Sequence, residues 1–195
     1  MTWFVVDGMD GCGKSTCADI IEDKLKRENH EVFKVTHPDQ GCLVGRLENA
    51  YLHKEGRLCK ILSTVFYILD VLDSLAKMRV HRKEYNDFIF VRYIMAVAYL
   101  PKGLQEKAYT LISKVLPMPD ELILVDVDAE TSMSRILGRG EALEAFENLE
   151  DLKQVRESML SLSDGWTVID NSRPLDEVRR QIEDHVDGIL RRYRA

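Results

Sequence analysis

The feature that most constrains the fold of this chain is an eight-residue motif close to its start. Residues 8–15 read Gly-Met-Asp-Gly-Cys-Gly-Lys-Ser and match the pattern G-x-x-x-x-G-K-[ST] in full. An apolar run, Trp3–Val6, precedes the motif, and a helical pattern from Lys14 to Glu28 follows it. A glycine-rich loop between a strand and a helix is the setting in which this motif binds phosphate. The motif therefore predicts a nucleoside triphosphate site on an α/β fold, without specifying the reaction.

Each residue type in the motif has a part in phosphate binding. Glycines let the backbone curl so that several N–H groups point at phosphate oxygens, and the positive end of the following helix adds to the attraction. Lys14 is expected to reach the β- and γ-phosphates, and the Ser15 hydroxyl is expected to ligate Mg²⁺. The predicted nucleotide-binding residues of the loop are Gly8, Asp10, Gly11, Cys12, Gly13, Lys14, Ser15 and Thr16.

The rest of the chain alternates short apolar runs with helical patterns. Runs this short, bounded by loop residues, are typical of strands buried on both faces. Alternating strands and helices favour a parallel sheet with right-handed crossovers. We expect an α/β fold with five strands, Trp3–Val6, Val32–Thr36, Phe88–Val91, Leu122–Val127 and Trp166–Ile169. Besides the helix from Lys14, we expect helices over Cys59–Met78 and from about Leu175 through Ile189.

The composition is that of a globular protein with an excess of negative charge. The 195 residues suffice for one domain with a real core, 45% of them are apolar and 31% are charged. A net charge of -6 argues against a large nucleic-acid-binding surface, although a local basic pocket for phosphates is compatible with it. The opening run, Thr2–Val6, is too short for a signal sequence or a membrane span. We therefore expect a cytoplasmic protein, a single domain over residues 1–195, that binds neither nucleic acid nor membrane.

The residues around the loop resemble the thymidylate kinase family of nucleoside monophosphate kinases. Residues 5–16 are similar to the family's opening, which carries an acidic residue inside the loop as Asp10 does here. Further similar segments follow in the family's order, namely His37–Pro38 with Leu43–Arg46, Arg92–Tyr93, Pro119–Glu130, Ala145–Arg156 and Trp166–Ser172.

This resemblance implies a kinase that transfers a phosphoryl group from ATP–Mg²⁺ to a nucleoside monophosphate, with dTMP as the default acceptor. It also implies the three-layer P-loop NTPase fold with a short helical lid, approximately 139–154, and a homodimer that forms through apolar helices. Gly11 occupies a position where some members place a catalytic arginine, which favours Arg139 in the lid. The implied catalytic residues are Lys14, Arg92, Arg139 and Arg135, of which Arg135 also contacts ATP. The implied acceptor-binding residues are Asp10 at the sugar, Tyr67 at the base, Arg92 at the phosphate, Arg46 and Tyr99.

Several of these residues also have an ordinary structural explanation. Asp10 suits a turn. Arg135 and Arg139 lie one helical turn apart and suit a solvated surface. Tyr67 lies in an apolar helix, where core packing is an equally good explanation. The charged segment 139–154 suits a solvated helix as well as a lid.

Three places on the acceptor side depart from the family pattern. Val91 stands where the family has an aspartate, Val71 stands where an arginine would grip the acceptor phosphate, and Ala96–Val97 replaces a small hydroxyl–glycine pair near the base. Valine cannot ligate Mg²⁺. A phosphate monoester has a second pKa near ~6 and needs no general base, so Val91 argues against a nucleoside kinase more than against a monophosphate kinase. Two alternatives stay open: an ATP-binding kinase-fold protein without nucleotide kinase activity, acting as a sensor or partner subunit, and a P-loop kinase of another small acceptor.

Overall fold

The computed structural model describes residues 1–39, 57–138 and 148–194, and it contains one sheet of five parallel strands. Along the sheet the strands run in the order β2-β3-β1-β4-β5. This arrangement confirms the expected α/β class and the P-loop NTPase fold. Each strand lies where the sequence predicts it, to within one residue at either end. The bounds are Thr2–Asp7 for β1, Val32–Thr36 for β2, Asp87–Val91 for β3, Glu121–Asp126 for β4 and Thr167–Asp170 for β5.

The apolar runs of this chain do not alternate with polar residues because the central strands of the sheet are buried on both faces. All six residues of β1 and all five of β3 are buried, because helices cover both faces of the sheet. Val6 on β1 pairs in register with Val91 on β3 and with Ile123 on β4. The carboxyl end of β1 is therefore flanked by the ends of two other strands.

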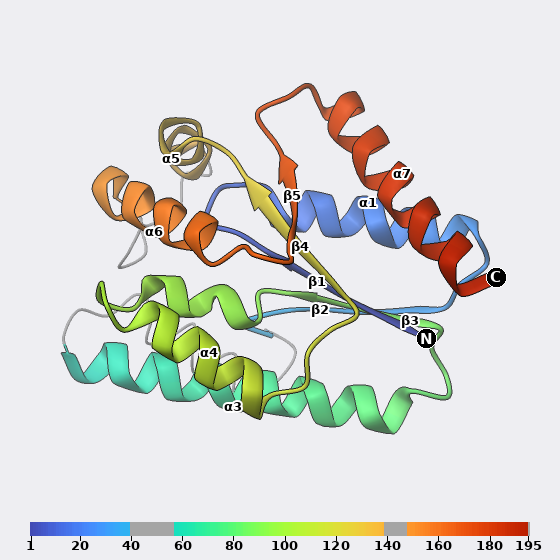
Figure 1. Ribbon diagram of the computed structural model, residues 1–195, viewed down its shortest axis with the longest axis horizontal. Coiled ribbons are helices and arrows are strands. Elements are labelled where there is room, and N and C mark those ends of the chain that lie inside the picture. Colours follow the sequence, from blue (N-terminus) through green and yellow to red (C-terminus); the bar gives the residue numbers. More distant parts are fainter. Residues whose placement is uncertain (40–56, 139–147, 195) are drawn as a thin grey trace.

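The helices form layers on the two sides of the sheet. Figure 1 shows α1 and α7 on one side and α3 and α4 on the other. Two caps fix the starts of shorter helices: Asp128 accepts from the backbone N–H of Thr131, and Asn148 accepts from that of Asp151. The helical elements are α1 Lys14–Arg27, α3 Arg57–His81, η1 Ile94–Tyr99, α4 Gln105–Val115, α5 Ala129–Leu137, α6 Leu149–Ser161 and α7 Leu175–Arg194.

The sequence predicts an apolar stripe on the last helix, formed by Leu175, Val178, Ile182, Val186 and Ile189. All of these except Leu175 are buried, and Leu190 is buried beside them, whereas Leu175 at the start of the helix is exposed. This face packs against α1, which in turn packs on β1, β2 and β3. The helix that follows the glycine-rich loop is thus fixed between the sheet and α7.

Part of the predicted lid lies outside the described residues. Residues 139–147 are not described, and neither is Arg46. The remainder of the lid segment begins α6, in which Leu152 and Val155 are buried. Helix α5, which carries Arg135, ends at Leu137, and Arg139 lies outside the described residues. The lid therefore stays a prediction.

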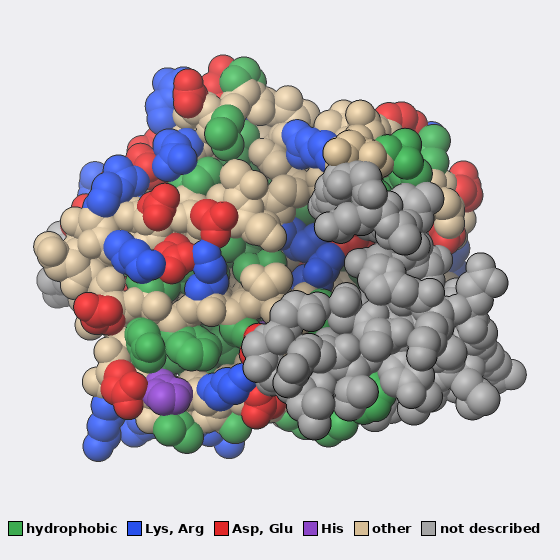
Figure 2. Space-filling model, turned by 180° about the vertical axis from the view of Figure 1, so that it is seen from behind, with side chains coloured by type: hydrophobic (Ala, Val, Ile, Leu, Met, Phe, Trp, Pro, Cys, Tyr) green, Lys and Arg blue, Asp and Glu red, His purple; other side chains and the backbone are tan. Residues whose placement is uncertain are grey.

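The surface carries charges of both signs. On the face that Figure 2 colours, Lys and Arg side chains lie among Asp and Glu side chains. None of the helices in the described ranges has the length and hydrophobicity that a membrane span requires.

Candidate active site

The glycine-rich loop, residues 8–13, lies at the carboxyl end of β1, where the direction of the strand order reverses. β3 pairs with one side of β1 and β4 with the other. In open α/β sheets this switch point is where ligands bind. The sequence thus places its phosphate-binding motif at the position that the topology favours for a ligand.

Two glycines of the loop have no room for a side chain. A Cβ on Gly11 would lie 2.6 Å from the backbone oxygen of Ser132, and one on Gly13 would lie 2.2 Å from Nδ2 of Asn171. Both residues also have positive φ, 75° and 96°, which favours glycine. The backbone therefore curls tightly enough to turn its N–H groups toward a bound anion.

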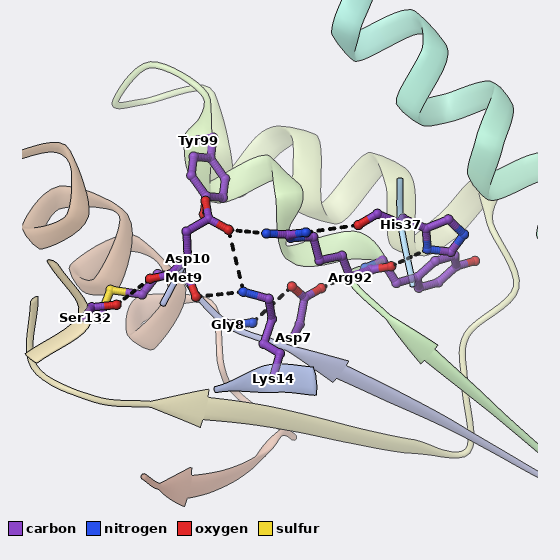
Figure 3. A network of polar contacts seen from close by, with 10 residues as sticks. Asp7, Gly8, Met9, Asp10, Lys14, His37, Arg92, Tyr99 and Ser132 are labelled. Carbon is purple, nitrogen blue, oxygen red and sulfur yellow. Dashed lines mark hydrogen bonds and ion pairs between the residues drawn. The ribbon is translucent and has the colours of Figure 1, made fainter. Parts of the chain in front are cut away.

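Lys14 and Asp10 form the centre of the network in Figure 3. The Lys14 Nζ donates to the backbone oxygen of Met9 at 2.7 Å and lies 3.7 Å from Oδ1 of Asp10. Asp10 also accepts hydrogen bonds from the Arg92 guanidinium and, at 2.8 Å, from the Tyr99 hydroxyl. One buried carboxylate thus contacts the lysine of the loop and an arginine from the end of β3.

The surroundings of Asp10 keep it ionised. Burial by itself raises the pKa of Asp10, but the charges of Arg92 and Lys14 and the Tyr99 hydroxyl outweigh burial and hold the pKa well below its ordinary value. Asp10 is therefore an anion at any physiological pH. The ordinary turn aspartate considered from the sequence does not describe this residue, because Asp10 is 7% exposed and ion-paired twice.

Arg92 is held by residues in, or directly after, the two strands that flank β3. Its backbone N–H donates to Val6 at 3.0 Å, and its guanidinium donates to the backbone oxygen of His37 at 3.1 Å. The His37 ring in turn joins the Arg92 carbonyl, 2.8 Å from Nδ1, to the Ser74 hydroxyl, 2.9 Å from Nε2. Arg92 has a φ of 67°, a left-handed conformation that is uncommon outside glycine.

The opposite side of the loop is held by residues of α5 and by the residue that follows β5. Asn171 donates to the Cys12 carbonyl at 2.6 Å, and Arg135 donates to the same carbonyl at 3.4 Å and to the Asn171 carbonyl at 3.1 Å. The Ser132 hydroxyl donates to the Asp10 carbonyl. The sequence predicted a role for Arg135 but none for Ser132 or Asn171, because an isolated Ser or Asn belongs to no recognisable motif.

The remaining predicted residues lie as follows. Ser15 and Thr16 are exposed at the start of α1. Tyr67 is partly buried on α3 and donates its hydroxyl to the backbone oxygen of Tyr93, so it belongs to the polar network and not only to the apolar core. Of the departures, Val91 is 1% exposed and Val71 is 3% exposed, so both valines are part of the core. The roles of these residues toward substrates stay predictions.

Comparison with known proteins gives a consistent result. A family model described as thymidylate kinase matches residues 6–182. A probable thymidylate kinase from Pyrobaculum aerophilum is 30% identical over 197 residues, covering 98% of this chain and 99% of that protein. A probable thymidylate kinase from Archaeoglobus fulgidus is 28% identical, covering 95% of this chain and 94% of that protein.

A solved structure supports the fold. The thymidylate kinase of Candida albicans has a TM-score of 0.78 to this chain at 19% identity, covering 97% of this chain and 92% of that one. At that identity the likeness concerns the fold alone. Because the family model matches most of the sequence and the Pyrobaculum relative aligns with nearly all of it, the chain belongs to the thymidylate kinase family.

Proposed function

We propose that this protein transfers the γ-phosphoryl group of ATP to dTMP, forming ADP and dTDP. The observation that carries the proposal is the meeting of Lys14 and Arg92 at one buried carboxylate, Asp10. Lys14 belongs to the loop that binds the donor phosphates, and Arg92 follows the strand beside that loop. A kinase needs cations for both phosphates at neighbouring positions, and this geometry supplies them.

The donor half of the site fits a nucleoside triphosphate. The curled loop, closed to side chains at Gly11 and Gly13, offers its N–H groups to the β- and γ-phosphates, and Lys14 adds its charge. Arg135, fixed to the loop through the Cys12 carbonyl, lies on the side where the adenine is expected.

Mg²⁺ fits the same half with few protein ligands. Ser15 is exposed at the N-terminus of α1, where its hydroxyl can hold the ion, with Thr16 beside it. The ion neutralises charge on the phosphate oxygens when it is bound. The described residues contain no group of three or more His, Cys, Asp or Glu that could hold a metal, and Mg²⁺ needs none because it keeps several waters.

The acceptor half positions the phosphate of the nucleoside monophosphate, whose oxygen is the nucleophile. Arg92 binds the phosphate of the monophosphate, Asp10 accepts a hydrogen bond from the sugar, and Tyr99 orients Asp10 through a 2.8 Å hydrogen bond. Tyr67 lies against the base, and Arg46, outside the described residues, completes the acceptor contacts. Arg139, from the lid, stabilises the transferring phosphoryl group.

The chemistry requires positioning and charge neutralisation rather than a general base. The acceptor phosphate has a second pKa near ~6 and is already a nucleophile at neutral pH. Val91 therefore does not remove a group that this reaction needs. The two alternatives, a nucleotide-binding protein without kinase activity and a kinase of another small acceptor, are not favoured by membership of the family.

Two further proposals concern the assembly and its compartment. Helix α3 exposes Ile68, Leu69 and Leu72, which are 49%, 45% and 44% exposed, and a second copy of the chain would cover this apolar face in a homodimer. The cytoplasm is the proposed compartment, since a kinase of this type needs a pool of ATP and nucleoside monophosphates.

The test is a coupled assay of ADP formation with Mg²⁺ over a panel of nucleoside monophosphates. We expect turnover that depends on dTMP and that Lys14→Ala abolishes. Lys26→Ala is the matched control, because Lys26 is an exposed lysine on the same helix, paired with Glu22. Tight ATP binding without turnover on any acceptor in the panel would contradict the proposed function.

A further inference from the structure

Asp7, the last residue of β1, carries no role in the site described so far. Its carboxylate is 2% exposed and accepts three backbone hydrogen bonds. Oδ1 accepts from Gly8 at 3.1 Å, and Oδ2 accepts from Tyr93 at 2.9 Å and from Met95 at 3.2 Å. Figure 3 shows Asp7 below Arg92, beside the start of the phosphate loop.

The partners of Asp7 lie at the two ends that the reaction must bring together. Gly8 is the first residue of the phosphate loop. Tyr93 follows Arg92 directly, between β3 and η1, and Met95 is the second residue of η1. One carboxylate therefore bridges the backbone of the donor loop and the backbone of the acceptor turn.

The acceptor turn needs such an anchor. Arg92 has a φ of 67°, a left-handed conformation that is strained for a non-glycine residue. Residues in this state persist only where the surrounding structure holds them. On one side of the turn the Val6 carbonyl and His37 hold Arg92 itself, and on the other side Asp7 holds the two N–H groups that follow.

The bonding of Asp7 points to a role toward the backbone. Three of the roughly four acceptor sites of its carboxylate are taken by N–H donors inside the protein. Burial raises the pKa of Asp7, with the N–H donors and the charge of Lys14 opposing the rise. A carboxylate bonded in this way acts on the backbone around it.

We propose that Asp7 is a positioning residue, which ties the phosphate loop to the turn after β3 and so holds Arg92 where it binds the acceptor phosphate. The catalytic part of this inference rests on the proposed function. The structural part, that Asp7 holds the backbone at Tyr93 and Met95, does not rest on the proposed function. The catalytic and structural parts can therefore be tested separately.

The experiment compares Asp7→Val with Asp7→Asn. Valine suits the end of a strand but accepts no hydrogen bond, so the N–H groups of Tyr93 and Met95 lose their partner. Asparagine keeps one acceptor oxygen, which can face the two N–H groups that share Oδ2. We expect Asp7→Val to raise the KM for dTMP about 10- to 100-fold, and Asp7→Asn to restore most of the loss. The KM for ATP should change far less, because Ser132 and Asn171 hold the phosphate loop independently.

Amide hydrogen exchange gives a second measurement that needs no activity. In Asp7→Val the amides of Tyr93 and Met95 should exchange faster than in the wild type, while amides in the middle of β3 keep their protection. Circular dichroism and thermal melting establish that the variant is folded; if Asp7→Val does not fold, Asp7→Asn must still show faster exchange at Gly8, where its amide nitrogen now faces a donor.

The outcomes separate the two claims. A folded Asp7→Val that lowers kcat with an unchanged KM for dTMP, or unchanged exchange at Tyr93 and Met95, would overturn the positioning role. Absence of dTMP-dependent turnover in the wild type would instead overturn the proposed function, and the exchange result would still decide whether Asp7 holds the turn.

Discussion

The donor half of the candidate site and its acceptor half are built in different ways. The donor half is mostly one continuous segment, residues 8–16, closed by glycines and supported by single hydrogen bonds from Ser132 and Asn171. The acceptor half is assembled from β1, the end of β2, the turn after β3 and η1, with Arg92 as its central residue. It also contains the positions at which the resemblance predicts departures, Val91 and Val71. The comparison teaches that a site formed by one continuous segment can be recognised from the sequence, whereas one assembled from several strands depends on the fold.

The largest effect that separates the two halves is expected from Arg92→Ala. Loss of this guanidinium should lower kcat/KM for dTMP by about 10³-fold, because the acceptor phosphate loses its cation. The KM for ATP should stay within about threefold of the wild type, because Lys14 and the loop remain. Steady-state kinetics with each substrate varied in turn measures both. Arg173→Ala, an exposed arginine paired with Asp170, is the control, and a parallel rise in the KM for ATP would show that the two halves are not separable.

The departure at Val91 is tested by restoring the carboxylate. Val91 is 1% exposed in the core, so Val91→Asp buries a charge and should cost about 3 kcal/mol of unfolding free energy. Val91→Thr, which has a similar shape and no charge, should cost less. Chemical denaturation measures both variants. We expect no gain in dTMP turnover from the aspartate; a large gain with stability retained would identify the wild-type acceptor half as an eroded version of the family site.

Asn171→Ala tests the donor half, because Asn171 supports the phosphate loop on the side away from Arg92. Removal of the hydrogen bond to the Cys12 carbonyl should loosen the loop and raise the KM for ATP about 10-fold, with the KM for dTMP unchanged. Asn86→Ala is the matched control, since Asn86 accepts a backbone hydrogen bond at the opposite end of the sheet. An effect on dTMP as large as that on ATP would contradict the independence of the two halves.

The smallest expected effect is a pH dependence at His37, next to the acceptor arginine. Burial lowers the pKa of His37 below its ordinary value, against the opposing influence of the Arg92 carbonyl and of the charges on Asp70 and Asp39. The unfolded chain therefore takes up the proton first as the pH falls below about 6.5, and the wild type loses stability there. His37→Gln cannot titrate. The difference in unfolding free energy between wild type and variant should shrink from about pH 7.5 to pH 5.5, and a constant difference would show that His37 is not titrating as its burial implies.

The sequence predicted the fold and the donor half well because both depend on local patterns. The five short apolar runs form the five strands of the sheet, and most of the apolar stripe on α7 is buried. The strand before the loop and the helix after it are also as predicted. Helix α4 was not predicted: none of its residues is fully buried, although Ala108, Tyr109 and Ile112 pack against the core.

The acceptor half was harder to predict because its contacts join distant parts of the chain. Asp7 meets Tyr93, and His37 meets both Arg92 and Ser74, across separations that no spacing rule covers. His37 was assigned no role from the sequence, since a single histidine without a cluster has no signature. Only the strand order brings these residues to the same end of the sheet.

The backbone of Arg92 has a consequence for selection. Glycine would adopt the φ of 67° without the left-handed penalty of about 1–2 kcal/mol, and its greater freedom in the unfolded chain would cancel only about half of that gain. The same substitution would remove the Arg92 guanidinium from the buried Asp10 carboxylate, and the loss of one partner of a buried ion pair costs about 3–5 kcal/mol. The ion pair therefore outweighs the strain of the left-handed backbone, and a screen for thermostability alone would retain the arginine.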